Sequence, residues 1–247
     1  MSTLRNIVAA SWVGFLLWGG AAHAQCTSIA SVPTIISASG VYCLTANLTN
    51  SSVHAAAIAV NASGVVIDFQ GYRLRWTGST TSGNPGVQVH ANKSNVTIRN
   101  GLISGFEIAI ESSAPGTIVE DMRMNSNALG VAIRSGGEGA IIRRNNIRLG
   151  NGIHVDGSNH PSFPANTGSV RVIDNDIHGP ELVQGNPGFN GIFISSKNAF
   201  VVGNRLGRLY TGIWFDSLRQ ATGKYRDNLS TNVTVPYQGG TDSGNNN

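Results

Sequence analysis

Charged residues are scarce in this sequence: only 12% of its 247 residues are Asp, Glu, Lys or Arg, about half the usual share. That scarcity excludes a coiled coil, a helical bundle stabilised by ion pairs and a disordered chain kept open by charge. No run of basic residues exceeds the pair Arg143-Arg144. We therefore expect no nucleic-acid partner.

Long hydrophobic runs are also absent. The one apolar stretch, Ile7 to Trp18, follows Arg5 and is too short to predict a transmembrane segment. Small residues and an A-x-A motif at Ala22-His23-Ala24 come next, which is typical of a signal peptide over residues 1–24. The sequence thus predicts a secreted or periplasmic protein that begins at Gln25.

Cysteine occurs only twice, at Cys26 and Cys43. In an oxidising compartment the two are expected to form a disulfide within an N-terminal cap, residues 25–50, with a stabilisation of about 3 kcal/mol. Cofactor motifs are lacking as well, because no glycine-rich phosphate loop opens a helix and no histidines have metal-ligand spacing. We expect no metal site and no cofactor, with calcium at Asp174-Asn175-Asp176 as the open alternative.

Glycine and asparagine, by contrast, are abundant, with 31 and 25 copies, and this favours many tight turns. A four-residue unit of glycine or a substitute, an aliphatic residue, any residue and a second apolar residue recurs with spacings of 21, 23, 22, 39 and 21 residues. The unit begins at Gly86, Glu107, Gly130, Gly152, Gly191 and Gly212.

A second short apolar unit that ends near Asn or Asp alternates with the first, as in Val96 to Leu102 and Ile141 to Ile147. A period of about 22 residues is too short for a propeller blade, and too few leucines hold fixed positions for a leucine-rich repeat. It fits an all-β parallel β-helix, in which each coil adds one rung to each sheet. We expect about seven coils within residues 51–237 and a disordered tail over residues 238–247.

The stretch Val65 to Leu74, with its apolar run, Asp68, Gly71 and a second apolar strand, resembles the first coil of right-handed parallel β-helix proteins of the pectin-lyase-like superfamily. The resemblance extends over roughly residues 60 to 230. It implies a single-stranded right-handed parallel β-helix. It leaves function open, because that superfamily includes lyases, hydrolases, epimerases, phage spikes and non-catalytic surface proteins.

Strand alternation directs the aliphatic residues of the first unit inward, so the residues between them face outward and stack in columns. The first predicted column contains Gln88, Ala109, Ala132, His154, Phe193 and Trp214. The second contains His90, Glu111, Arg134, Asp156, Ser195 and Asp216. Two insertions, Gly157 to Gly168 and Gly179 to Asn190, adjoin these columns and account for the longest spacing.

The aromatic residues of the first column suit stacking against sugar rings. We therefore predict polysaccharide binding at this face, although the rings could instead be covered by the insertions or by another protein. The predicted substrate-binding residues are Phe193, Trp214, His90, Asp216 and His160.

Catalysis at this face is a further possibility. Arg134 or His154 could act as a base, while Glu111 and Asp156 could act as acids or bind a cation. Two rungs separate these carboxylates, about 9 to 10 Å, at the upper limit for an inverting glycosidase. The same residues could also form only a ladder of charge pairs.

Signatures of polygalacturonases and mannuronan epimerases are absent. Two functions therefore stay open. The protein either binds an extended polysaccharide, and cleaves it if it is a lyase or glycoside hydrolase, or it is a non-catalytic envelope protein that docks another protein. The sequence does not define the oligomeric state.

Overall fold

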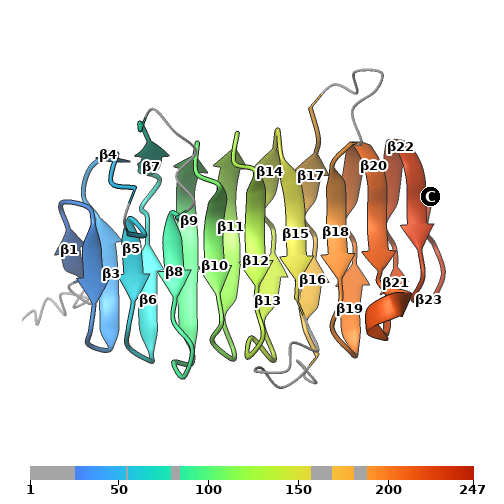
Figure 1. Ribbon diagram of the computed structural model, residues 1–247, viewed down its shortest axis with the longest axis horizontal. Coiled ribbons are helices and arrows are strands. Elements are labelled where there is room, and N and C mark those ends of the chain that lie inside the picture. The colour runs from blue at the N-terminus through green and yellow to red at the C-terminus, as the bar shows by residue number, and fades with distance from the viewer. Residues whose placement is uncertain (1–25, 54, 79–83, 157–168, 181–187) are drawn as a thin grey trace, which may run out of the picture.

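The computed structural model describes residues 26–53, 55–78, 84–156, 169–180 and 188–247. These residues form 23 β-strands and one short 3-10 helix, η1 (Ser217–Arg219). The chain winds through successive coils, and corresponding strands of neighbouring coils pair in parallel, as Ile153 does with Ile192 (Figure 1). This confirms the predicted parallel β-helix. Among the described residues, no helix is long and apolar enough to cross a membrane.

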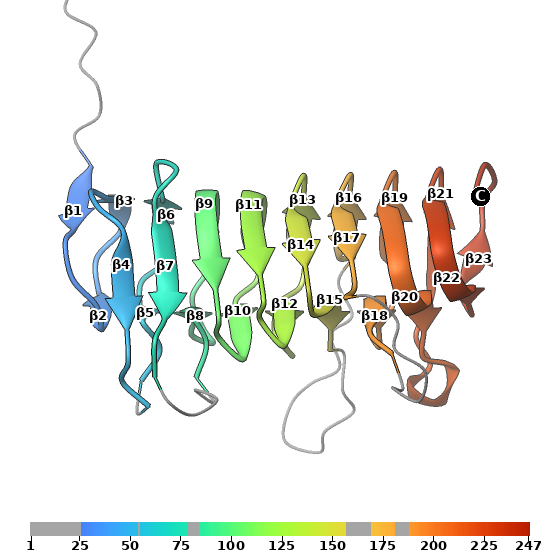
Figure 2. The same ribbon diagram turned by 90° about the horizontal axis from the view of Figure 1, so that it is seen from above.

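Three long sheets form the walls of the solenoid, and the longest strands bend from one wall into the next (Figures 1 and 2). The first sheet contains β2 (Thr34–Ile36), β5 (Ile58–Val60), β8 (Val87–Val89), β10 (Ile108–Ser112), β12 (Leu129–Ile133), β15 (Asn151–Val155), β18 (Asn190–Ile194) and the ends of β20 (Arg205–Phe215) and β22 (Leu229–Gln238).

The second sheet contains β1 (Thr27–Ile29), β3 (Gly40–Leu44), β6 (Val65–Asp68), β13 (Ile141–Arg143), β16 (Arg171–Ile173), β19 (Ala199–Val202), β21 (Gly223–Arg226), β23 (Thr241–Asp242) and the starts of β9 (Val96–Ser104) and β11 (Ile118–Asn125). The third sheet contains β4 (Leu48–Asn50), β7 (Arg73–Trp76), β14 (Asn146–Arg148), β17 (Asp176–His178), the ends of β9 and β11 and the starts of β20 and β22.

The core is a continuous column of aliphatic side chains along the axis. Ile153, Ile192 and Ile213 pair on successive rungs and are each at most 1% exposed, as the alternation predicts. Burial of each such side chain contributes on the order of 2 kcal/mol, and the β-branched shape suits a strand. Within each strand, the residue between two inward aliphatic side chains therefore faces outward.

The rung at β10 corrects one predicted alignment. Ile110, not Ile108, pairs with Val87 and Val131, so Ala109 takes the place of the repeating glycine. That place needs a small residue, because a Cβ at Gly86 would lie 2.8 Å from the Ala109 carbonyl oxygen. Glu111 consequently belongs to the first column and not to the second.

Ser112 explains why the sequence pattern was misleading at this rung. It occupies an inward position that hydrophobic residues fill on most other rungs, and it is fully buried. Its hydroxyl lies 2.7 Å from the Thr117 hydroxyl, so the polar group is satisfied inside the core. Because Ser112 is polar, the sequence pattern of two alternating aliphatic residues fits Ile108 and Ile110 and not the true inward pair, Ile110 and Ser112.

An asparagine ladder runs along the corner between the second and third sheets. Each buried side-chain amide donates to the carbonyl oxygen of the next, at 3.0 Å, and the same oxygen accepts the backbone N–H of the preceding asparagine. Its members are Asn145, Asn175, Asn204, Asn228 and Asn246.

The N-terminal end of the solenoid agrees with expectation, and the C-terminal end does not. Cys26 and Cys43 form the predicted disulfide, and β1 to β4 pair with later strands of the stack. The prediction of a disordered tail over residues 238–247 is wrong. β23 pairs with β21, and Asn246 continues the ladder, because paired backbone and amide groups compensate for ordering a polar segment.

Candidate functional site

Three aromatic rings lie in one column on the outer face of the first sheet. His154, Phe193 and Trp214 occupy paired positions on β15, β18 and β20. The centroids of the His154 and Phe193 rings are 4.5 Å apart, and those of Phe193 and Trp214 are 4.9 Å apart. Both pairs meet edge to face, an arrangement that ring quadrupoles favour. The column is therefore a packed aromatic strip whose rings remain partly exposed.

A cleft of about 330 Å³ opens along this strip. It brings together Trp214, Phe193 and Asp216 from the predicted substrate-binding set. Sequence reasoning missed Asn151, Asn190 and Arg219, which also line it. Both asparagines directly precede the repeating glycine, so their shared spacing was a usable signal.

The two asparagines differ in what their side chains do. The Asn151 amide bridges rungs, because it donates to the Ala128 carbonyl at 3.2 Å and accepts the Asn190 backbone N–H at 2.9 Å. The Asn190 side-chain amide makes no hydrogen bond to the part of the chain that the structure describes. It is the more available of the two for a ligand.

Burial lowers the pKa of His154 below its usual 6.5. Asp156 opposes that shift by its negative charge, while Arg134 and Arg219 add to it. The Nε2 atom is buried and has no hydrogen-bond partner within the described residues. His154 is therefore a neutral ring that serves as one wall of the strip.

Asp216 and η1 close the C-terminal end of the cleft. The Asp216 carboxylate accepts the Leu218 backbone N–H at 3.0 Å and thereby caps η1. Nε of Arg219 lies 3.6 Å from the same carboxylate, and the Arg219 guanidinium carbon lies 5.9 Å from the centroid of the Phe193 ring. Arg219 thus adds a cation–π contact to one ring of the strip.

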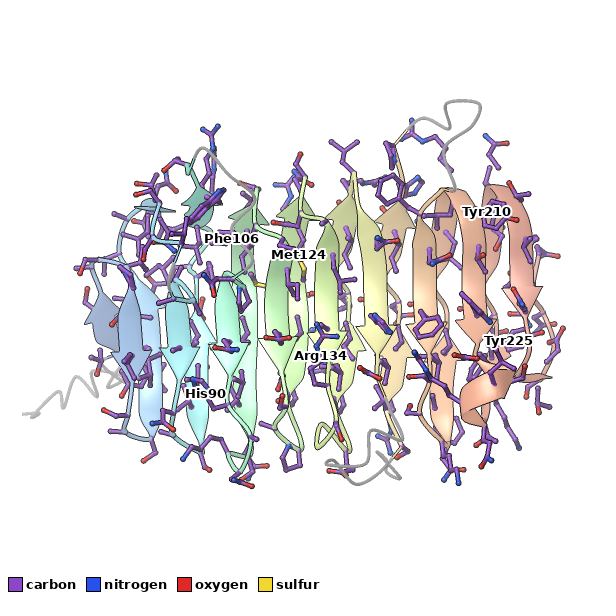
Figure 3. The ribbon with its side chains drawn as sticks, viewed as in Figure 1. His90, Phe106, Met124, Arg134, Tyr210 and Tyr225 are labelled. Carbon is purple, nitrogen blue, oxygen red and sulfur yellow. A yellow bond between two sulfur atoms is a disulfide. The ribbon has the colours of Figure 1, made fainter. Side chains whose placement is uncertain are left out.

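A charged ladder occupies the neighbouring rungs toward the N-terminus, near the middle of the face in Figure 3. Nε of Arg134 donates to Glu111 at 2.8 Å, and NH1 of Arg134 lies 3.9 Å from Asp156. Gln88 donates to the other Glu111 oxygen at 3.1 Å. Arg134 therefore lies between the two candidate carboxylates, as expected of a charge-pair ladder.

The remaining candidates are placed apart from the cleft or outside the described residues. His90 directly follows β8, and its rung is three rungs, or about 14 Å, from the rung of His154. Figure 3 shows His90 toward the N-terminal end of the solenoid. His160 and most of both insertions lie outside the described residues. The Asp174-Asn175-Asp176 oxygens diverge, since Asn175 is in the ladder and Asp176 pairs with Arg148.

Among the described residues, no group of three or more His, Cys, Asp or Glu side chains is arranged to hold a metal ion. The architecture and this face define a solenoid with an aromatic cleft on its first sheet. A family model described as a right-handed β-helix region matches residues 35–206. The chain belongs to this right-handed β-helix family.

Solved structures similar to this chain include the catalytic domain of a GH87 alpha-1,3-glucanase in complex with nigerose. It has 10% identity and a TM-score of 0.49, and the match covers 91% of this chain and 63% of that domain. A variant of such a domain in complex with tetrasaccharides has 9% identity and a TM-score of 0.42, with the same shares covered. This chain therefore spans less than two thirds of each of these two domains. A comparison with curated proteins gives no match.

Proposed function

We propose that this protein binds an extended polysaccharide along the outer face of the first sheet. One observation carries the proposal: three rings on consecutive rungs line a cleft beside a side-chain amide and a carboxylate. Rings offer apolar surface to the faces of sugars, and the polar groups at the rim can bond to hydroxyls. The rungs rise along the axis, so a linear ligand can contact several of them.

Binding is better supported than cleavage by the described groups. Arg134 donates to Glu111 and lies 3.9 Å from Asp156, and a charged guanidinium is no proton acceptor. The Nε2 atom of His154 has almost no contact with solvent. A lyase or hydrolase reaction remains an additional hypothesis, in which Arg134, His154, Asp156 and Glu111 carry the chemistry.

The test measures affinity for a panel of neutral and uronic-acid polysaccharides by titration calorimetry. Trp214→Ala and Phe193→Ala should each weaken binding by about 1 to 3 kcal/mol, the range for aromatic anchors. Phe200→Ala is the matched control, because Phe200 is 42% exposed on the second sheet, away from the cleft. If neither cleft variant weakens binding, or if no polysaccharide binds, this face is not a sugar site.

The same panel tests cleavage. Release of reducing ends or of unsaturated products would show turnover, and Arg134→Ala or His154→Ala should then abolish it. If the panel gives neither binding nor products, a cleft that docks another protein becomes the better explanation, since η1 beside it presents Leu218, which is 93% exposed.

We also propose that the protein is exported. The apolar stretch Ile7 to Trp18, the A-x-A motif and the Cys26–Cys43 disulfide support a route into an oxidising compartment. N-terminal sequencing of protein recovered from outside the cytoplasm should then begin at Gln25. A product that retains residues 1–24 would contradict this.

A further inference from the structure

The outer face of the third sheet has an unbalanced positive charge. Its outward residues on β7, the end of β11, β14, β17 and the start of β20 include five arginines and one acidic residue, a balance of +4. The whole chain from residue 25 onward carries only +3, because 16 basic residues meet 13 acidic ones once Arg5 is removed. These arginines are Arg73, Arg75, Arg123, Arg148 and Arg205.

Charge on the other two sheets is paired at most positions, with Arg171 and Lys224 on the second sheet as exceptions among the described residues. Arg99 meets Asp68 on the second sheet, and Arg143 and Arg144 both meet Glu120. The Glu111–Arg134–Asp156 ladder on the first sheet is paired as well. Among the arginines of the third sheet that the structure describes, only Arg148 has such a partner, Asp176, whose other oxygen lies 2.8 Å from Nε2 of His178.

Four arginines of the third sheet make no ion pair with any residue that the structure describes. They are Arg73, Arg75, Arg123 and Arg205, and all four are exposed. Like charges placed in a row on a rigid wall repel one another, so an arrangement without counter-charges favours an anionic partner.

The sheet register arranges these side chains as a track along the solenoid axis. Arg73 pairs with Leu102, which pairs with Arg123, so two rungs or about 10 Å separate the two arginines. The same column continues through Asn146 and Asp176 to Arg205, about 24 Å from its start. Figure 2 looks onto the strands of this sheet, which lie side by side.

A hollow of about 500 Å³ lies at the N-terminal end of the track, with Arg73 and Arg123 in its lining. The one carboxylate in that lining, Asp121, is held by Arg144 at 2.8 Å and does not pair with either arginine of the hollow. The two guanidinium groups are thus left for a ligand. Each can grip a carboxylate with two parallel hydrogen bonds.

We infer that the outer face of the third sheet binds a linear acidic polysaccharide, which lies along the axis with its carboxylates on the arginine track. A track favours a linear polymer over a compact anion. Single-stranded nucleic acid fits less well, because the outward residues between the arginines, such as Ser104, Asn125 and Asn146, offer no aromatic ring for base stacking. This site is separate from the aromatic cleft and does not depend on it.

The experiment uses polygalacturonate as the probe, with dextran as a neutral polymer and duplex DNA as a competing polyanion, in low and in moderate salt. Wild type should bind polygalacturonate, more weakly as salt rises, and dextran should not compete. Arg73→Gln/Arg123→Gln should weaken this binding roughly tenfold, because two charge contacts with the polyanion are lost.

The matched control is Arg171→Gln/Lys224→Gln, which removes the same charge from exposed positions on the second sheet. It should change affinity less than about twofold. Equal weakening in both double variants would mean that only net charge matters, and tighter binding of DNA would mean that the partner is not a polysaccharide. Either result overturns the inference. Trp214→Ala should leave polygalacturonate binding to the arginine track intact, so failure of the cleft proposal is detected separately.

Discussion

On the outer face of the first sheet, the half from β8 to β12 is charged, whereas the half from β15 to β20 is aromatic. In the charged half, Gln88 and Arg134 both donate hydrogen bonds to Glu111. In the aromatic half, the rings contact mainly each other and border an open cleft. The difference shows that one regular wall can carry a self-contained ladder and a surface suited to a ligand within a few rungs.

The largest expected effect concerns the strand alternation on which both halves depend. Ile192→Asp buries an unpaired charge between Ile153 and Ile213, so it should reduce the free energy of unfolding by more than about 4 kcal/mol. Urea denaturation followed by circular dichroism measures the loss.

Gln88→Ala, on the outward side of the same sheet, is the control and should cost under about 1 kcal/mol. A normal midpoint for Ile192→Asp would mean that the inward and outward assignments are reversed. Both the ladder and the aromatic strip would then be misplaced.

A smaller effect is expected at His154, where the two halves meet. Its pKa in the folded state lies below 6.5, so the unfolded chain binds the proton more readily. The contribution of His154 to stability is complete above pH 6.5 and falls as the pH drops toward the folded-state pKa. His154→Asn should lose this part of the pH dependence.

Melting temperatures of wild type and His154→Asn between pH 5 and 8 provide the measurement. Carboxylates titrate in both proteins, so the difference between the two curves isolates His154. Parallel curves would show that the ring is solvated and that the strip is more open than its contacts indicate.

The smallest effect is expected in the charged half. Arg134→Gln and Glu111→Gln should each lower stability by under about 1 kcal/mol, because both side chains keep contact with water. Neither should change polysaccharide affinity at the cleft. A loss of affinity beyond about tenfold in either variant would instead make the ladder part of the binding site.

The fold was predictable because a solenoid repeats its inward pattern, and Ile153, Ile192 and Ile213 recur in register. The alignment of one rung, at β10, was predicted wrongly, because Ser112 is polar yet buried. The Asn and Asp residues at the ends of the second apolar units lie in two neighbouring columns, which the sequence does not separate. Asn100, Asp121 and Asp227 hold left-handed corner positions, while the stacked amides lie one residue later in each coil.

The candidate site was predictable only in part. The column of Phe193 and Trp214 follows from alternation alone, but Arg219 reaches the cleft through a 3-10 turn that no repeat encodes. The sequence does not predict the arginine track, because its members are far apart in the chain and are aligned only by the register of the third sheet. Asn151 and Asn190 were visible as a repeated pair, yet their role depends on where the cleft opens.

The asparagine ladder also gives the solenoid a direction. Each amide N–H of the ladder points toward the next coil, so the aligned dipoles add, with the positive end at the C-terminal coil. There the Asn246 amide donates to the Asp242 carboxylate at 2.6 Å, which places a negative charge at the positive end. The two ends of the ladder therefore need different partners: the coil before it supplies a donor, the Met122 backbone N–H at 3.0 Å from the Asn145 side-chain oxygen, whereas a coil added after Asn246 must supply an acceptor.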